Sequence, residues 1–229
     1  MNQKLVTVIM ATKNSAKYLS QALDSVSDSG YEKIELLIVD ANSSDGTQEI
    51  IRKHEKTVSF RIELLAQEGT GLYKAWNQAL DKATGEYFAF LDSDDYWLKD
   101  RLRIGIDFII KNPDFDYLIS HFRFFLEQGG SVPKGFNEDL FSKDLIGRIP
   151  GTVLAHRDTF NKVGNFNQAY SIAGDVDWFA RAKDMKLKLK ILDQVLLFKR
   201  IHESNLSSFA EKNTKDLLKL LRDTIERQK

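Results

Sequence analysis

The segment FAFLDSDDYW (residues 88–97) joins an apolar run to a cluster of acids. Its four apolar residues end abruptly at Asp92, and Asp94 and Asp95 follow within three positions. Three carboxylates between apolar residues repel one another and are costly to desolvate unless positive charge lies among them. The segment therefore predicts a buried strand that ends at a cation site.

The residues around this segment alternate between two periodicities. Continuous apolar runs rich in β-branched residues predict strands covered on both faces, at residues 5–11, 34–39, 60–66 and 87–91. Apolar residues at helical spacing predict helices at 15–28, 45–54, 72–83 and 98–110. Strands and helices that alternate in this way predict an α/β fold with a doubly wound, mostly parallel sheet.

Several residues have the character of helix ends. Asp45 and Gln48 have the spacing of a capping box, and Gly85 is placed to end the third helix. Asp95 could cap a helix that starts near Trp97. A cap accounts for one acid of the cluster, so it does not replace the cation interpretation.

The second half of the chain is less regular, and we expect it to form a smaller, mixed part of the same domain. Strands are predicted at 117–126, 153–156 and 191–201, and helices at 157–163, 175–186 and, as an amphipathic C-terminal helix, 213–227. A loop is expected at 128–134, and residues 135–150 are polar and poorly periodic.

Composition excludes several classes of protein. The 229 residues contain 33 Lys and Arg and 33 Asp and Glu, which argues against a general nucleic-acid binder. There is no cysteine, hence no disulfide framework and no thiolate metal site. No apolar stretch is long enough for a membrane span, and the N-terminal apolar run is too short for a secretory signal. We therefore expect a cytoplasmic protein.

Polar residues follow three of the predicted strands. Thr12 and Asn14 follow the first strand, Asp40 ends the second, and the acid cluster ends the fourth. The carboxyl ends of parallel strands share one edge of a sheet, where ligands bind. Asp92 and Asp94 are two apart, so their side chains point the same way in an extended segment. Their oxygens suit Mg²⁺ or Mn²⁺, particularly beside a substrate phosphate.

Other motifs leave alternatives open. GTGLYK (residues 69–74) begins like a dinucleotide-binding loop, but it follows the third strand and ends in Lys74. Asp175 and Asp177 lie at the start of a predicted helix, where acids often only cap the helix or interact with its dipole. His202, after the last strand, could be structural or a ligand.

Taken together, the motifs resemble the family 2 glycosyltransferases, which have the GT-A fold. The resemblance covers about residues 5–205. It is carried by VTVIMATKN (6–14), LLIVDANSSDGTQEII (36–51), GTGLYKAWNQALDKATGEYFAFLDSDD (69–95) and GNFNQAYSIAGDVDWFARA (164–182).

The resemblance implies a role for each candidate residue. Asp40 would bind the base of the nucleotide, with Thr12, Asn14 and Asp92 lining the nucleotide pocket. Asp94 would be the main metal ligand, with His202 near the metal or the diphosphate, and Asp175 would be the general base. Glu68, Lys74 and Gly174 depart from the pattern common in relatives, and Asp177 remains a rival base.

The implied activity is an inverting transfer of a sugar from a nucleoside diphosphate donor, with UDP favoured, to a hydroxyl acceptor, with Mn²⁺ or Mg²⁺ as cofactor. Residues 1–112 would bind the donor and residues 113–205 a saccharide or lipid-linked acceptor. Peripheral contact with the inner face of the membrane and a homodimer are left open for the helix at 213–228. The alternatives are a nucleotidyltransferase and a non-catalytic nucleotide-sugar-binding protein.

Overall fold

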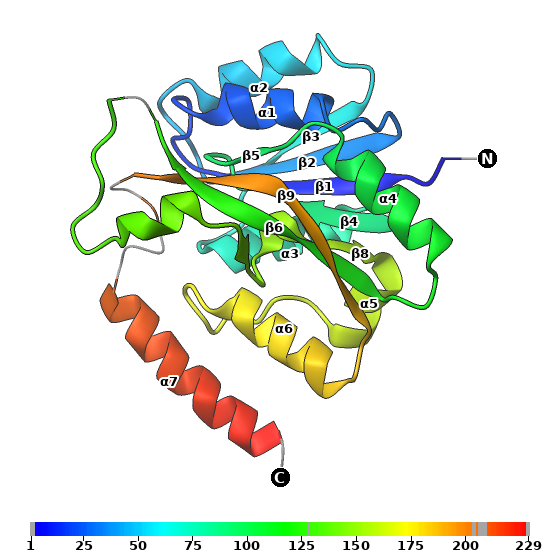
Figure 1. Ribbon diagram of the computed structural model, residues 1–229. Helices are drawn as coiled ribbons and strands as arrows, with labels where there is room; N and C mark the ends of the chain where they lie inside the picture. The colour runs from blue at the N-terminus through cyan, green and yellow to red at the C-terminus, as the bar shows by residue number, and fades with distance from the viewer. Residues whose placement is uncertain (1–2, 128, 203–204, 206–209, 228–229) are drawn as a thin grey trace.

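The structure is a computed structural model that describes residues 3–127, 129–202, 205 and 210–227; Gln128, the first residue of the expected loop, lies outside this part. Within it, nine strands form one sheet, in the order β3-β2-β1-β4-β8-β6-β9-β5 with β7 beside β6 (Figure 1). The strands are β1 (Val6–Thr12), β2 (Ile34–Asp40), β3 (Arg61–Ala66), β4 (Tyr87–Phe90), β5 (Tyr96–Trp97), β6 (Tyr117–Leu126), β7 (Leu145–Ile146), β8 (Leu154–His156) and β9 (Leu189–Ile201).

Helices cover both faces of the sheet. They are α1 (Leu19–Ser27), α2 (Thr47–Glu55), α3 (Leu72–Lys82), α4 (Arg101–Lys111), α5 (Arg157–Val163), α6 (Gly174–Asp184) and α7 (Ala210–Arg227), with short 3₁₀ turns at Glu138–Ser142 and Pro150–Thr152. Adjacent residues of β1 point to opposite faces: Val8 packs in one core with α1 and α4, and Ile9 in a second core with α3, α5 and α6. Two buried faces explain the continuous apolar strands.

The first half confirms the predicted doubly wound arrangement, because β3, β2, β1 and β4 are all parallel. The second half is mixed. Strand β8 is antiparallel to β4 and β6, and β9 is parallel to β6. Two-residue β5, which follows the acid cluster, pairs antiparallel with β9. This pairing, which the sequence did not indicate, brings residues 198–202 beside the acids.

Three expected helix ends are wrong. Helix α4 begins at Arg101 rather than near Trp97, since Tyr96 and Trp97 are in β5. Gly46 is the N-cap of α2, and Gln48 donates to Asp40 instead of forming a capping box with Asp45. Helix α3 ends at Lys82, three residues before Gly85, which was expected to end it.

Gly85 is required for close packing rather than for ending α3. A Cβ atom at this residue would lie 2.6 Å from the backbone nitrogen and the hydroxyl of Thr7. Close approach of β1 to this turn explains the glycine.

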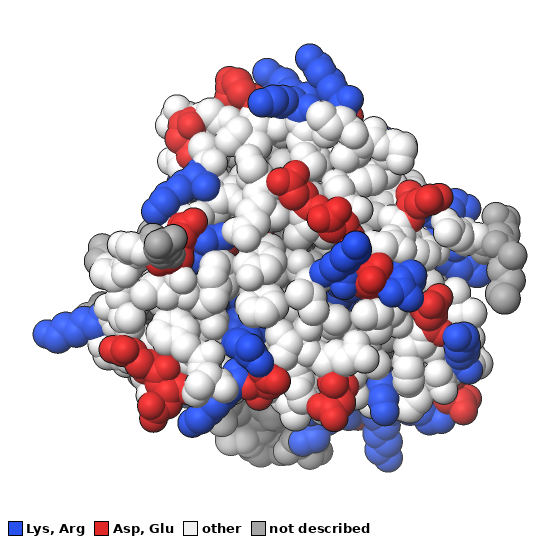
Figure 2. Space-filling view, turned by 45° about the horizontal axis from the view of Figure 1, so that its top comes forward, with Lys and Arg blue, Asp and Glu red and all other residues white. Residues whose placement is uncertain are grey.

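Charged side chains of both signs are interspersed over the face shown in Figure 2, apart from a group of basic side chains at its upper edge. This distribution fits the zero net charge. Among the described helices, none is both long enough and apolar enough to cross a bilayer.

Candidate functional site

An open cleft of about 1940 Å³ lies at the carboxyl ends of β1, β2 and β4. Its lining includes all seven residues named as candidates from the sequence: Thr12, Asn14, Asp40, Asp92, Asp94, Asp175 and His202. The tertiary structure therefore brings the two halves of the chain together around one cavity. Neither Glu68 nor Lys74 belongs to the described lining.

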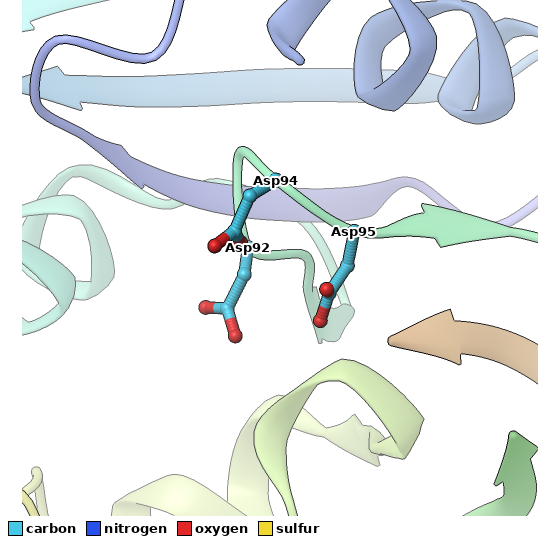
Figure 3. A group of neighbouring side chains, drawn as sticks. All are labelled: Asp92, Asp94 and Asp95. Atoms are coloured by element: carbon cyan, nitrogen blue, oxygen red, sulfur yellow. The ribbon is translucent and has the colours of Figure 1, made fainter. Parts of the chain in front are cut away.

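The acid cluster lies in a turn and not in the extended segment expected for it. The Asp95 N–H donates to the Asp92 carbonyl at 3.2 Å, which closes the turn directly after β4. One carboxylate oxygen from each of Asp92, Asp94 and Asp95 lies within 4.8 Å of the others. Figure 3 shows the Asp92 and Asp94 carboxylates close together, with that of Asp95 to one side. The turn therefore brings the carboxylates together. An extended segment was expected to do this for Asp92 and Asp94.

Lys199 provides positive charge among these acids. Its Nζ lies 3.2 Å from Asp92 Oδ2 and 3.0 Å from Asp95 Oδ2. Burial alone would lower the pKa of Lys199, but the carboxylates raise it, so the ammonium stays charged. Lys199 was not predicted from the sequence, although it lies only three positions before His202.

Asp95 is not a helix cap. Its carboxylate is 1% exposed, pairs with Lys199 and accepts the backbone N–H of Arg200 at 2.8 Å. Both partners come from β9, which β5 holds in place. Asp95 therefore joins the acid turn to β9.

Asp94 contacts His202, with 3.0 Å between Asp94 Oδ2 and the imidazole Nε2. Burial raises the pKa of Asp94, but the His202 hydrogen bond and the Lys199 charge outweigh it, so the net pKa is lowered. The His202 ring stacks on Tyr18 at 5.1 Å between centroids. Buried Arg200 donates to the Asp94 carbonyl at 2.8 Å. Asp94 is therefore ionised and oriented from two sides.

The cluster has the charge and donor atoms that a divalent cation requires. Three carboxylates face a single ammonium, that of Lys199, so acids outnumber basic groups in the cluster. Carboxylate oxygens are the ligands that suit Mg²⁺ or Mn²⁺. The residues present therefore fit a single divalent ion at Asp94, with Asp92 and His202 beside it.

The far end of the cleft is built around Asp40, which is 2% exposed. Its Oδ2 accepts the Ser43 N–H at 3.0 Å and the Gln48 amide at 2.8 Å. Asn14, in the left-handed region at φ 49°, donates its N–H to Ser43 Oγ and accepts the Ser44 N–H at 2.9 Å. Asp40 and Asn14 therefore hold the loops after β1 and β2 together at the edge of the sheet.

Thr12 lines the same end of the cleft, but its hydroxyl is buried and has no hydrogen-bond partner among the described residues. A buried hydroxyl without a partner is costly. Thr12 therefore lines the cleft with a hydroxyl donor and acceptor that no described residue satisfies.

Asp175 and Asp177 have different surroundings. Asp177 is 1% exposed and pairs with Arg181 at 2.8 Å and Arg227 at 3.0 Å. Asp175 is half-buried, lines the cleft and accepts hydrogen bonds on Oδ1 from the Tyr73 hydroxyl at 3.1 Å and the Val176 N–H at 2.9 Å. Burial raises the pKa of Asp175 to about 6, and these hydrogen bonds limit the rise. The geometry favours Asp175 over Asp177 as a base.

Residues 7–167 match the sequence model of the family described as glycosyl transferase family 2. The chain belongs to this family. The match extends from β1 to the segment that precedes α6, so it includes the acid turn. Family membership confirms the resemblance carried by the sequence motifs.

Curated relatives with the higher identities match about half of the chain. A putative teichuronic acid biosynthesis glycosyltransferase of Bacillus subtilis, TuaG, is 40% identical over 108 residues, or 47% of this chain and 42% of the relative. A glucosyltransferase of Escherichia coli, WfgD, named for UDP-Glc and a diphosphoundecaprenol-linked GlcNAc, is 37% identical over 113 residues, or 49% and 45%. The matched region thus spans less than half the length of these relatives.

Solved structures share the fold. TarS of Staphylococcus aureus with UDP-GlcNAc has a TM-score of 0.70 at 24% identity, with 89% of this chain and 61% of TarS covered. The mannosyltransferase PcManGT of Pyrobaculum calidifontis with GDP-Man and Mn²⁺ has a TM-score of 0.75 at 21% identity, with 99% and 65% covered. These similarities confirm the predicted GT-A fold.

Proposed function

We propose that this protein is an inverting glycosyltransferase that moves a sugar from a nucleoside diphosphate sugar, with a UDP-sugar favoured, to a hydroxyl acceptor. The observation that carries the proposal is the cleft itself. It joins an acid-rich carboxylate–imidazole cluster to a separate carboxylate, Asp175, with a pKa of about 6. The names of the relatives and the complexes with UDP-GlcNAc and GDP-Man support a nucleotide-sugar donor.

Asp94 and His202 would hold Mn²⁺ or Mg²⁺, with Asp92 beside them. A divalent ion there would supply Lewis-acid stabilisation for the leaving diphosphate. Lys199 keeps Asp92 and Asp95 from repelling the diphosphate, since its ammonium pairs with both. Asp40, Thr12 and Asn14 would bind the nucleoside at the other end of the cleft.

Asp175 would take the proton of the acceptor hydroxyl as its oxygen bonds to the anomeric carbon and the bond from that carbon to the diphosphate breaks. Both protein hydrogen bonds to the carboxylate end on Oδ1, which leaves Oδ2 without a protein partner among the described residues. Oδ2 is therefore the atom that would receive the proton.

Calorimetric titration of the protein with UDP, with and without Mn²⁺, tests the donor half of the proposal. We expect UDP to bind the unaltered protein only when Mn²⁺ is present. Asp94→Ala should lose this binding. Binding of UDP that ignores Mn²⁺, or no binding of any nucleoside diphosphate, would contradict it. A screen of nucleotide sugars for hydrolysis would then identify the sugar.

The acceptor we propose is a saccharide, carried on a lipid as in the name of the E. coli relative. A location at the cytoplasmic face of the membrane follows from that acceptor. Helix α7 exposes four large apolar side chains that could meet the bilayer: Leu217, Leu218, Leu221 and Ile225. Co-flotation of the protein with anionic vesicles, lost in Leu221→Asp, tests this contact.

A further inference from the structure

Helix α6, which carries Asp175 in its first turn, begins without a cap of its own. Its N-cap residue is Ala173, whose side chain has no hydrogen-bonding atom, and Ile172 and Gly174 flank it. The N–H groups at the start of a helix need acceptors, and Ser, Thr, Asp or Asn normally supply one locally. Asp175 itself accepts the Val176 N–H, so what is held from elsewhere in the chain is the backbone directly before the helix.

Asp216 of α7 anchors the backbone that leads into α6. A single oxygen, Oδ2, accepts the backbone N–H groups of Ser171 at 2.6 Å, Ile172 at 2.7 Å and Ala173 at 3.3 Å. The side chain of Asp216 is 8% exposed, and α7 lies beside α6 in Figure 1. Hydrogen bonds to an ionised acceptor are about twice as strong as neutral ones. One carboxylate thus holds three consecutive peptide groups directly before Asp175.

Other contacts from α7 extend along the same segment. Lys219 donates to the Ala169 carbonyl at 3.2 Å, and the Tyr170 hydroxyl donates to Asp223. Beyond Asp175, Arg227 pairs with Asp177 at 3.0 Å. The helix therefore holds the backbone on both sides of the proposed base.

We propose that α7 positions the catalytic base and that Asp216 is the positioning residue through which it acts. This inference rests on the proposed function, in which Asp175 takes the acceptor proton. The described lining of the cleft includes no residue of α7, so Asp216 acts only through the 171–175 backbone. Displacement of a reacting group by about 1 Å can cost on the order of 100-fold in rate.

The position of Asp216 predicts different effects on donor binding and on the transfer step. Asn14 follows β1, Asp40 ends β2 and Asp94 follows β4, whereas the hydrogen bonds of Asp216 go to residues 171–173. Loss of the Asp216 carboxylate should therefore leave donor binding intact and slow the transfer step. If α7 only stabilised the fold, loss of the Asp216 carboxylate would not lower kcat while leaving donor KM unchanged.

The experiment compares Asp216→Ala and Asp216→Asn with Glu226→Gln, which alters an exposed acid on the same helix. We expect Asp216→Ala to lower kcat by about 10- to 100-fold, with donor KM and Mn²⁺-UDP affinity unchanged. Asp216→Asn, which keeps one acceptor oxygen, should recover part of kcat. Glu226→Gln should match the unaltered protein.

Hydrogen exchange provides a readout that does not depend on activity. The amides of residues 171–173 should lose protection in Asp216→Ala and keep it in Glu226→Gln. If the unaltered protein transfers no sugar, the proposed function fails, and exchange alone decides whether Asp216 orders the loop. An unaltered kcat in a transferring enzyme, an equal loss of Mn²⁺-UDP binding, or full protection of residues 171–173 in Asp216→Ala would overturn the inference.

Discussion

At the scale of single residues, the environment of Asp175 predicts the pH dependence of transfer. Burial raises the pKa of its carboxyl to about 6, and a general base acts only when deprotonated. The value of kcat/KM should therefore fall as pH decreases through about 6. The Tyr73 hydroxyl stabilises the charged form, so Tyr73→Phe should raise that pKa further.

A pH profile of kcat/KM for Tyr73→Phe should then show its acidic limb at higher pH than the unaltered enzyme. Tyr31→Phe is the matched control, because its hydroxyl donates to the Lys4 carbonyl outside the cleft. Superimposed acidic limbs for all three proteins would show that Asp175 is not the titrating base.

The same raised pKa predicts a stability effect for Asp175→Asn. An acid whose folded pKa lies above its unfolded value destabilises the fold when ionised, so this cost is present at neutral pH and disappears as pH falls toward 4. The variant should lose transfer by about three orders of magnitude while its Tm at pH 7.5 is no lower than that of the unaltered protein. Thermal scans at pH 7.5 and pH 4.5 check that the Tm difference between the variant and the unaltered protein is larger at the higher pH. Asp193→Asn, at an exposed acid, is the control. A large drop in Tm would mean that Asp175 is structural.

At the scale of elements, the pairing of β5 with β9 decides which charges meet at the acid turn. Lys199→Met should leave Asp92, Asp94 and Asp95 without their ammonium partner. Loss of one partner of a mostly buried pair costs about 3 kcal/mol. Mn²⁺ should then raise the Tm of the variant more than that of the unaltered protein, since the ion replaces the missing charge.

Thermal unfolding with EDTA and with Mn²⁺ measures this difference. Lys190→Met on the same strand is the control, because the Lys190 ammonium lies over the Phe108 ring, 5.6 Å from its centroid. Equal Tm shifts with Mn²⁺ in the two variants would show that the charge of Lys199 does not affect the metal site.

At the scale of the whole molecule, one sheet extends through both expected halves of the chain, from β3 to β5. We therefore expect a single cooperative unfolding transition in scanning calorimetry, which would support the single-domain prediction. Mn²⁺ with UDP should raise the Tm of that transition, because the proposed ligand contacts Asp40 in β2 and His202 after β9. Two transitions, only one of which responds to the ligand, would contradict this prediction.

The order of elements and the composition of the cleft were predictable because they depend on local patterns. Continuous apolar strands, helical periodicity and polar residues at strand ends are all visible along the chain. Errors occurred where contacts outside the helix in question override local preference. Asp95 has the character of a cap but pairs with Lys199, and Gln48 has the spacing of a capping box but donates to Asp40.

The sequence by itself determined the doubly wound half-sheet, the family and seven of the residues that line the cleft, since burial periodicity and motif spacing are properties of short segments. Only the tertiary structure decided that Lys199 lies among the acids, that Asp177 is committed to two arginines, and that Asp216 holds the backbone before α6. Each of these contacts joins residues 43 or more positions apart, apart from the Asp177–Arg181 pair within α6. Such contacts depend on β-pairing and helix docking, which no local pattern records.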